Sequence, residues 1–343
     1  MSGRKQTVPD PPPGVPRRRV GFTYDRKEDY LAAGFSPADV MEFDAEDTIS
    51  ALESTIRDLG NEVVRIGRGR ELARRLVAGE RWDMVFNFAE GVRGRSREAQ
   101  VPALCELFDQ PYTFADPLTC AITLDKGIAK RVVRDSGLAT AAFAVVSAPD
   151  EAARVTLAPP LFVKPIAEGS SKGVTTRSLV SERSQLGDVC AELIAAFAQP
   201  VLVEEYLPGR EFTVGVLGNG STARVVGVME VCFTDAAEAP AYTALNKDEY
   251  LERVSYRLVT EEPLASQARA LALGACSALG CRDAARIDLR CAADGTPCFL
   301  EANPLPGLNL VRSDLPIMAR LAGMPFTELM GSILDEAALR YKV

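Results

Sequence analysis

RIDLRCAADGTPCFLEAN, residues Arg286–Asn303, alternates polar and apolar side chains on either side of Asp294-Gly295. Asp-Gly is typical of tight hairpin turns. Side chains two residues apart in a strand lie on the same face of a sheet. A two-residue turn at this dipeptide therefore predicts one polar face with two opposed pairs: Arg286 with Asn303, and Asp288 with Glu301.

This polar face suits a magnesium ion. Asp288 and Glu301 contribute carboxylates, Asn303 contributes a carboxamide, and Arg286 adds a guanidinium beside them. Mg²⁺ prefers oxygen ligands and keeps positions free for phosphates. The alternative is a solvated hairpin face with ordinary cross-strand pairs, and the hairpin by itself does not separate the two.

A loop rich in glycine and serine favours phosphate binding. Lys164 ends the apolar strand 161–164 and is followed by Pro-Ile-Ala-Glu-Gly-Ser-Ser-Lys-Gly173. The lysine supplies a cation, and the small residues supply backbone N–H groups that can approach phosphates closely. The segment does not match the Walker A pattern, and a mobile connector is the alternative.

Acidic residues follow a second apolar strand. The strand 201–205 ends in Glu204 and Glu205, and Glu211 comes shortly after Pro208-Gly209. Carboxylates there can accept hydrogen bonds from an adenine amine or from ribose hydroxyls. Solvated charges at a sheet edge are the alternative.

Composition limits the chemistry open to the chain. Its 343 residues are 47% hydrophobic and 25% charged, with 47 acidic and 39 basic residues and a net charge of −8. This acidic balance argues against a general binder of nucleic acids or anionic membranes. Because histidine is absent, Ser-His-Asp and Cys-His catalysis and histidine metal sites are excluded.

The N-terminal part of the chain is predicted to be α/β. Strands are expected at 19–24, 62–66 and 83–88, separated by helices that run from Asp44 to Gly60 and over 71–78. This alternation indicates a parallel sheet with crossover helices, which extends to about Pro117. A Pro-rich, disordered tail is expected at residues 1–18.

The rest of the chain mixes helices and strands. Helices are expected over 118–138, 264–279 and 328–341, and strands at 143–146, 161–164, 201–205, 212–217 and 225–231, with a hairpin at Gly218-Asn219-Gly220. The eight cysteines fit no zinc spacing and mostly lie in apolar stretches. They indicate buried, reduced thiols in a cytoplasmic protein. No uncharged run reaches the length of a membrane span.

Several short motifs follow one another in a characteristic order. They are Thr-Leu-Asp-Lys126, Phe-Val-Lys164-Pro, Glu168-Gly-Ser-Ser-x-Gly, Val-Leu-Val-Glu-Glu-Tyr-Leu207, Glu211-Phe-Thr-Val, Arg286-Ile-Asp and Leu-Glu301-Ala-Asn-Pro-x-Pro-Gly307. This order resembles the ATP-grasp superfamily, and within it the D-alanine–D-alanine ligases, from about Asp83 to Leu334. The resemblance implies an α/β ATP-grasp fold with an N-terminal α/β domain (19–117), a central ATP-grasp subdomain (118–206) and a C-terminal subdomain (207–343) that carries the magnesium and acceptor sites.

The resemblance also implies roles for single positions. ATP is expected at Lys126, Lys164, Glu168, Ser170, Ser171, Glu204, Glu205, Tyr206, Leu207 and Glu211. Two Mg²⁺ ions, with Mn²⁺ as an alternative, are expected at Asp288, Glu301 and Asn303. Catalytic roles are expected for Arg286, Ser170 and Lys247, and substrate binding for Arg286, Gly307, Arg312 and Ser313.

The activity that the resemblance implies is ATP-dependent joining of a carboxylate to an amine through an acyl phosphate. The expected partners are small amino-acid or related substrates, with neither nucleic acid nor membrane, and a homodimer stays open. Two other functions stay open as well. One is a true D-alanine–D-alanine ligase of cell-wall synthesis, and the other is a small-molecule kinase on the same fold.

The substrate half departs from the family pattern. Phe86-Asn-Phe-Ala-Glu-Gly91 replaces the histidine motif expected near the donor. The family's glutamate that binds the donor's amino group has no clear counterpart, and Asp39, Glu42 and Asp44 are candidates for that role. We therefore expect altered substrate specificity.

Two further charges, Arg312 and Asp314, lie near the expected acceptor site. Arg312 either faces solvent or pairs with Asp314, or it binds a second carboxylate of a substrate larger or more acidic than D-alanine.

Overall fold

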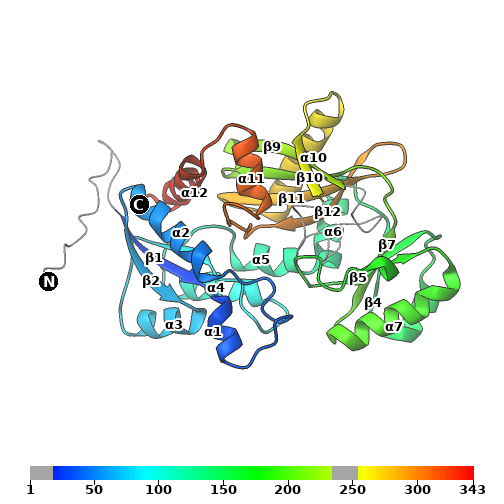
Figure 1. The fold of residues 1–343 in the computed structure, drawn as a ribbon, viewed down its shortest axis with the longest axis horizontal. Helices are drawn as coiled ribbons and strands as arrows, with labels where there is room; N and C mark the ends of the chain where they lie inside the picture. The colour runs from blue at the N-terminus through cyan, green and yellow to red at the C-terminus, as the bar shows by residue number, and fades with distance from the viewer. Residues whose placement is uncertain (1–17, 234–253) are drawn as a thin grey trace, which may run out of the picture.

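The computed structural model describes residues 18–233 and 254–343, which form three β-sheets and the helices that cover them (Figure 1). The disordered tail predicted at 1–18 lies outside the described residues except for Arg18, and so does Lys247. No helix in the described part of the chain is long and apolar enough to cross a membrane.

The N-terminal sheet is parallel, as the alternation of strands and helices predicted. It has the order β2-β1-β3, with β1 at Arg19–Tyr24, β2 at Glu62–Gly67 and β3 at Met84–Phe88. Its helices are α1 (Lys27–Ala32), α2 (Glu46–Asp58), α3 (Gly69–Val77) and α4 (Gln100–Leu107). The sequence analysis did not predict α1 and α4.

The second sheet is four-stranded and antiparallel, in the order β4-β7-β5-β6. Its strands are β4 (Phe143–Val146), β5 (Leu161–Pro165), β6 (Leu179–Val180) and β7 (Val201–Glu205), and α7 (Leu186–Phe197) packs on it. Figure 1 shows this sheet and α7 set apart from the N-terminal sheet.

The helical stretch expected over 118–138 is confirmed, but it is divided into two helices. The structure has α5 (Pro117–Leu124) and α6 (Lys126–Asp135), separated by Asp125. Asp125 has an extended backbone, and its carboxylate accepts a hydrogen bond from the Ile128 N–H at 3.0 Å. A side chain that caps the next helix in this way ends the preceding one.

The third sheet is five-stranded and antiparallel, in the order β10-β9-β8-β11-β12. Its strands are β8 (Glu211–Leu217), β9 (Arg224–Phe233), β10 (Val254–Leu258), β11 (Ala284–Cys291) and β12 (Pro297–Asn303). Its helices are α10 (Leu264–Leu279), α11 (Asp314–Leu321) and α12 (Phe326–Tyr341). The predicted hairpin between β8 and β9 is confirmed.

The predicted pairing of β11 with β12 is confirmed at the polar face. Asp288 lies opposite Glu301, and Arg286 lies opposite Asn303. Near the turn, however, the register differs by one residue, because Leu289 pairs with Phe299 across a bulge.

The predicted two-residue turn is wrong. The Ala292 N–H donates to the Thr296 carbonyl at 2.9 Å, so the loop contains three residues, 293–295. Gly295 takes the left-handed conformation (φ 86°) that closes such loops. The bulge in β12 adds one residue and thereby restores the register of the polar face.

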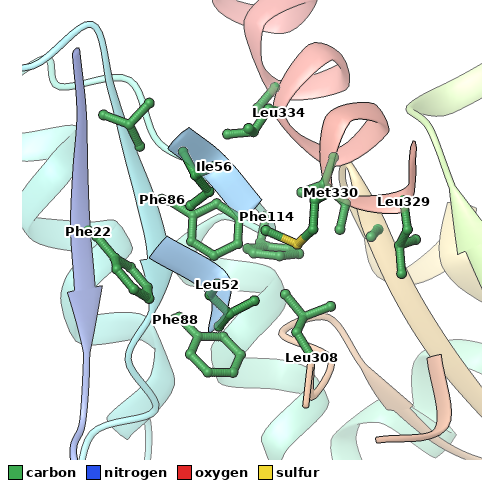
Figure 2. Packing of buried hydrophobic residues seen from close by; sticks show 14 of the residues in the cluster. Phe22, Leu52, Ile56, Phe86, Phe88, Phe114, Leu308, Leu329, Met330 and Leu334 are labelled. Atoms are coloured by element: carbon green, nitrogen blue, oxygen red, sulfur yellow. The ribbon is translucent and has the colours of Figure 1, made fainter. Parts of the chain in front are cut away.

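The three sheets fall within the predicted segments 19–117, 118–206 and 207–343, whose independence as domains stays a prediction. One hydrophobic core nevertheless joins the first and third segments. Figure 2 shows its buried side chains from the N-terminal sheet, α2, α12 and the loop before α11: Phe22, Phe86, Leu52, Ile56, Leu329, Met330, Leu334 and Leu308. Side chains of α12 thus complete the core of the N-terminal unit.

Two leucines of α12 allow a matched test of this core. Leu329 is fully buried in it, whereas Leu339 is 73% exposed on the same helix. Leu329→Ala should lower the free energy of unfolding by about 2–5 kcal/mol, because it leaves a cavity in the core. Leu339→Ala should change it by about 0.5 kcal/mol or less. Urea unfolding measures both, and equal effects would contradict the shared core.

Candidate active site

All the residues predicted to bind ATP line one cavity between the four-stranded and five-stranded sheets. We call it the nucleotide cavity; it encloses about 1010 Å³ of empty space, part of it open to solvent. From the predicted set it contains Lys126, Lys164, Glu168, Ser170, Ser171, Glu204, Glu205, Tyr206, Leu207 and Glu211. Their roles stay predictions, but the structure brings them together.

A buried chain of charges underlies one wall of this cavity. The Glu204 carboxylate lies between two lysines, 2.7 Å from Lys164 Nζ and 2.8 Å from Lys130 Nζ. Lys130 is fully buried and also donates hydrogen bonds to Thr140 Oγ1 at 2.8 Å and to the Phe299 carbonyl at 3.2 Å. The prediction that Lys164 supplies a fixed cation fits this arrangement.

Burial opposes the ionisation of Glu204, but the two adjacent ammonium groups outweigh it and hold the pKa of Glu204 at about 2. Glu204 is therefore not a solvated edge charge, whereas the neighbouring Glu205 is exposed. The sequence analysis missed Lys130. Its spacing of four residues from Lys126, on one face of α6, was the available signal.

The acid expected near the ribose has a guanidinium partner that the sequence analysis also missed. Glu211 lies 3.1 Å from Arg290, which stacks over the Tyr206 ring at 5.3 Å. Burial raises the pKa of Glu211 to about 7, although Arg290 acts in the opposite direction. Glu211 and Arg290 lie on adjacent strands, β8 and β11, and both line the nucleotide cavity.

The Gly/Ser loop is held at its start by the N-terminal unit. The Gly169 N–H donates to the Glu42 carboxylate at 2.7 Å, and a Cβ at Gly169 would lie 2.6 Å from the same oxygen. Ser170 and Ser171 both adopt the left-handed conformation, with φ of 48° and 58°. The Lys126 ammonium donates to the Glu168 carbonyl at 2.5 Å, so a lysine that the sequence predicted to bind ATP contacts the loop directly.

The predicted metal ligands lie together on the hairpin. Asp288 and Glu301 are directly opposed, and the Asn303 carboxamide nitrogen lies 3.1 Å from Asp288. Arg286 forms two hydrogen bonds with Asp288, at 2.9 and 3.0 Å, and Lys126 lies 3.3 Å from Glu301.

Within residues 18–233 and 254–343, no group of three or more Asp, Glu, Cys or His side chains forms a metal-binding cluster. The candidate metal site therefore has two carboxylates and one carboxamide. This oxygen donor set fits Mg²⁺, which binds through one or two carboxylates and keeps further positions for phosphates.

A second cavity lies between the nucleotide cavity and the N-terminal unit. We call it the substrate cavity, because the residues predicted to bind substrate line it: Arg286, Gly307, Arg312 and Ser313. It encloses about 2010 Å³ of empty space, part of it open to solvent. Of the three donor-binding candidates, Glu42 and Asp44 line this cavity and Asp39 does not. Glu90, from the segment that departs from the family pattern, lines it too.

The substrate cavity is acidic on its N-terminal side. Burial raises the pKa of Asp44 to about 6 and that of Glu98 to about 7, and it raises the pKa of Glu90 well above the usual range. Negative neighbours, Glu42 among them, add to the shifts of Glu90 and Glu98.

The expected alternative pairing of Arg312 with Asp314 is not what the structure shows. Arg312 is exposed along the substrate cavity, and Asp314 instead lies 3.5 Å from Arg286. The Ser313 hydroxyl accepts a hydrogen bond from the Asn309 N–H at 3.0 Å. The exposure of Arg312 fits the solvent-facing alternative, and the residue lines the substrate cavity.

Comparison with known proteins identifies the family of this chain. The family described as D-ala D-ala ligase C-terminus matches residues 132–335. A D-alanine–D-alanine ligase of Bordetella petrii is 36% identical over 276 residues, 79% of this chain and 80% of that protein. One from Methylobacterium radiotolerans is 32% identical over 93% of this chain and 97% of its own length. An uncharacterized protein, y4sG of Sinorhizobium fredii, is 37% identical over 75% of each chain.

Solved structures show the same fold. D-alanine–D-alanine ligase from Bacillus anthracis complexed with ATP has a TM-score of 0.71 and 21% identity, and it covers 95% of this chain and 99% of that one. VanG D-Ala:D-Ser ligase from Enterococcus faecalis has a TM-score of 0.67 and 20% identity, with 94% and 100% covered.

The fold and these matches define an ATP-grasp ligase, an ATP-dependent enzyme that forms a C–N bond. The chain belongs to the D-alanine–D-alanine ligase family. The α/β fold and the family predicted from the motif order are both confirmed.

Glu204 gives the site a pH-dependent stability that can be measured. Its folded pKa is about 2, whereas the ordinary value is 4.5. Its stabilisation is therefore complete above pH 4.5 and is lost as the pH falls toward 2. Glu204→Gln should lower the free energy of unfolding by about 3 kcal/mol or more at pH 6, and by much less near pH 2.

Urea unfolding at both pH values measures the difference. Glu205→Gln, at the adjacent exposed carboxylate, is the control and should have little effect at either pH. A difference for Glu204→Gln that stays constant with pH would contradict the buried ion pairs.

Proposed function

We propose that the enzyme uses ATP to convert a carboxylate into an acyl phosphate and then joins it to the amine of an amino acid. The observation that carries this proposal is the shared wall of the two cavities. Arg286, Lys126 and Glu301 line both of them. A phosphorylated carboxylate in the nucleotide cavity and an amine in the substrate cavity would meet at these residues.

The nucleotide half supplies positioning and charge. Lys126 and Lys164 would hold phosphates, Ser170 and Ser171 would present the loop N–H groups, and Glu211 would bind the ribose. Asp288, Glu301 and Asn303 would hold Mg²⁺, which when bound neutralises charge on the transferring phosphoryl group. Arg286, on the shared wall, would stabilise the oxyanion of the tetrahedral intermediate.

The substrate half supports a specificity other than D-alanine with D-alanine. Arg312 and Ser313 line the cavity, which also carries Asp44, Glu90 and Glu98. A guanidinium can bind a carboxylate with two hydrogen bonds. We therefore propose an acceptor with a free α-carboxylate and a second acidic group. The enzyme would act on soluble amino acids in the cytoplasm, and a homodimer is compatible with this function.

A screen for phosphate release tests the function. The protein, ATP and Mg²⁺ are incubated with pairs of L- and D-amino acids, and phosphate, ADP and products are measured. Release of phosphate together with an amide supports the ligase. A phosphorylated product without free phosphate would instead support the kinase alternative. Robust D-alanyl-D-alanine synthesis, with no better pair, would support a cell-wall ligase and contradict altered specificity.

Glu301 tests the role of the hairpin. Glu301→Gln keeps the size of the side chain but removes one of the two carboxylates of the metal site. It should reduce kcat about 100-fold or more, because charge stabilisation of the transition state is lost. Glu192→Gln, an exposed glutamate of α7, is the control. Wild-type turnover by the Glu301 variant would remove the metal role.

Arg312 tests the acceptor specificity. Arg312→Ala should raise KM about tenfold for an acceptor with a second carboxylate, because a charge-assisted hydrogen bond is lost. KM for an acceptor without that group should change little. Steady-state kinetics with aspartate and alanine as acceptors, in the same chirality, give the comparison. An equal rise for both acceptors would show that Arg312 does not recognise the second carboxylate.

A further inference from the structure

Six side chains or loop residues form the wall that the nucleotide and substrate cavities share: Lys126, Glu168, Ser170, Arg286, Glu301 and Asp314. Three of them are carboxylates. The reaction between an acyl phosphate and an amine must take place at this wall, so any base for the amine must be present there. Since the chain has no histidine, a carboxylate is the natural group for that task.

Two of the three carboxylates are already engaged. The Glu168 oxygens contact Gln199 at 2.6 Å and Lys172 at 3.2 Å. Glu301 contacts Lys126 and belongs to the proposed metal site.

Asp314 differs from both. Its side chain is buried, with Oδ2 3.5 Å from Arg286 Nη1, and Oδ1 has no hydrogen-bond partner among the residues that the structure describes. A buried carboxylate oxygen without a donor is costly, which indicates a donor supplied by a ligand.

We propose that Asp314 binds the ammonium group of the acceptor and acts as the base that deprotonates it. This inference rests on the proposed function, because it needs an amine acceptor in the substrate cavity. Arg312 lies two residues away along that cavity, so Asp314 and Arg312 can bind the ammonium group and the second carboxylate of one acceptor. The acceptor's ammonium group then points toward the nucleotide cavity and its second carboxylate away from it.

The acceptor enters as an ammonium ion, whose nitrogen has no lone pair. One N–H proton passes to the Asp314 carboxylate, which becomes a neutral acid. The freed lone pair forms the C–N bond to the acyl carbon, the C–O bond to phosphate breaks, and the phosphate leaves with the electron pair. A second N–H proton passes to the phosphate, and Asp314 returns its proton to solvent as the amide leaves.

Hydroxylamine separates this role from a structural one. At neutral pH it is uncharged and has a free lone pair, so it attacks an acyl phosphate without a base and gives a hydroxamate. In Asp314→Asn, amide formation should fall about 100-fold or more, while hydroxamate formation should stay within about threefold of wild type. Both are measured with ATP, Mg²⁺ and D-alanine as donor, or the best donor of the phosphate-release screen. Asp335→Asn, at an exposed aspartate of α12, is the control.

If Asp314 acted only by positioning Arg286, the expected result would differ. Arg286 would stabilise the oxyanion formed by either nucleophile, so loss of both products in Asp314→Asn overturns the inference. Retention of both products overturns it too.

A further readout is pH: the deficit in amide formation should shrink about tenfold for each unit of rising pH, as the acceptor loses its proton in solution.

Two controls keep the test decisive. If Asp314→Asn does not fold, Asp314→Glu replaces it in the experiment, because this variant moves the carboxylate by one methylene. An amide-to-hydroxamate ratio equal to that of the wild type then overturns the inference. Wild-type protein that makes no hydroxamate from any donor refutes the proposed function, and the inference with it. If the wild-type protein makes both products and the Asp314 variant makes both equally well, the inference is refuted and the proposed function stands.

Discussion

Pairing of β11 with β12 is the constraint on which the candidate site depends. The two strands place Arg286 and Asp288 opposite Asn303 and Glu301, and β8 holds the other edge of β11. Because backbone hydrogen bonds fix these positions, the charged side chains need little reorganisation to face phosphates. The cavities on either side of the hairpin share its side chains. The same few residues therefore serve the nucleotide and the amino-acid substrate.

Buried charge is tolerated in this site because each charge has an opposite neighbour. Glu204 lies between Lys130 and Lys164, and Arg286 lies between Asp288 and Asp314. Isolated charges in such a place would be strongly destabilising. The two clusters differ in net charge, because the first has one extra cation and the second one extra anion. The first suits phosphates, and the second suits a cation or an ammonium group.

The sequence predicted most of the fold because strand and helix periodicity is local. It predicted the register of the polar face correctly, but through two errors that cancelled: the loop has three residues instead of two, and a bulge in β12 adds the compensating residue. Long-range pairing decides such details. Lys130 and Arg290 escaped prediction for a related reason, since a lysine in a helix or an arginine in a strand is usually solvated, and only the tertiary structure shows each beside an acid.

The core shared by the N-terminal sheet and α12 has a consequence for how the protein is made. Phe22 and Phe86 leave the ribosome long before Leu329 and Leu334, which belong to the same core. Until α12 emerges, the part of this core that α12 covers stays exposed. Growing chains must therefore keep this surface from aggregating during synthesis, and premature termination before α12 yields a product with an exposed core. Burial of this core is therefore complete only once α12 has been made.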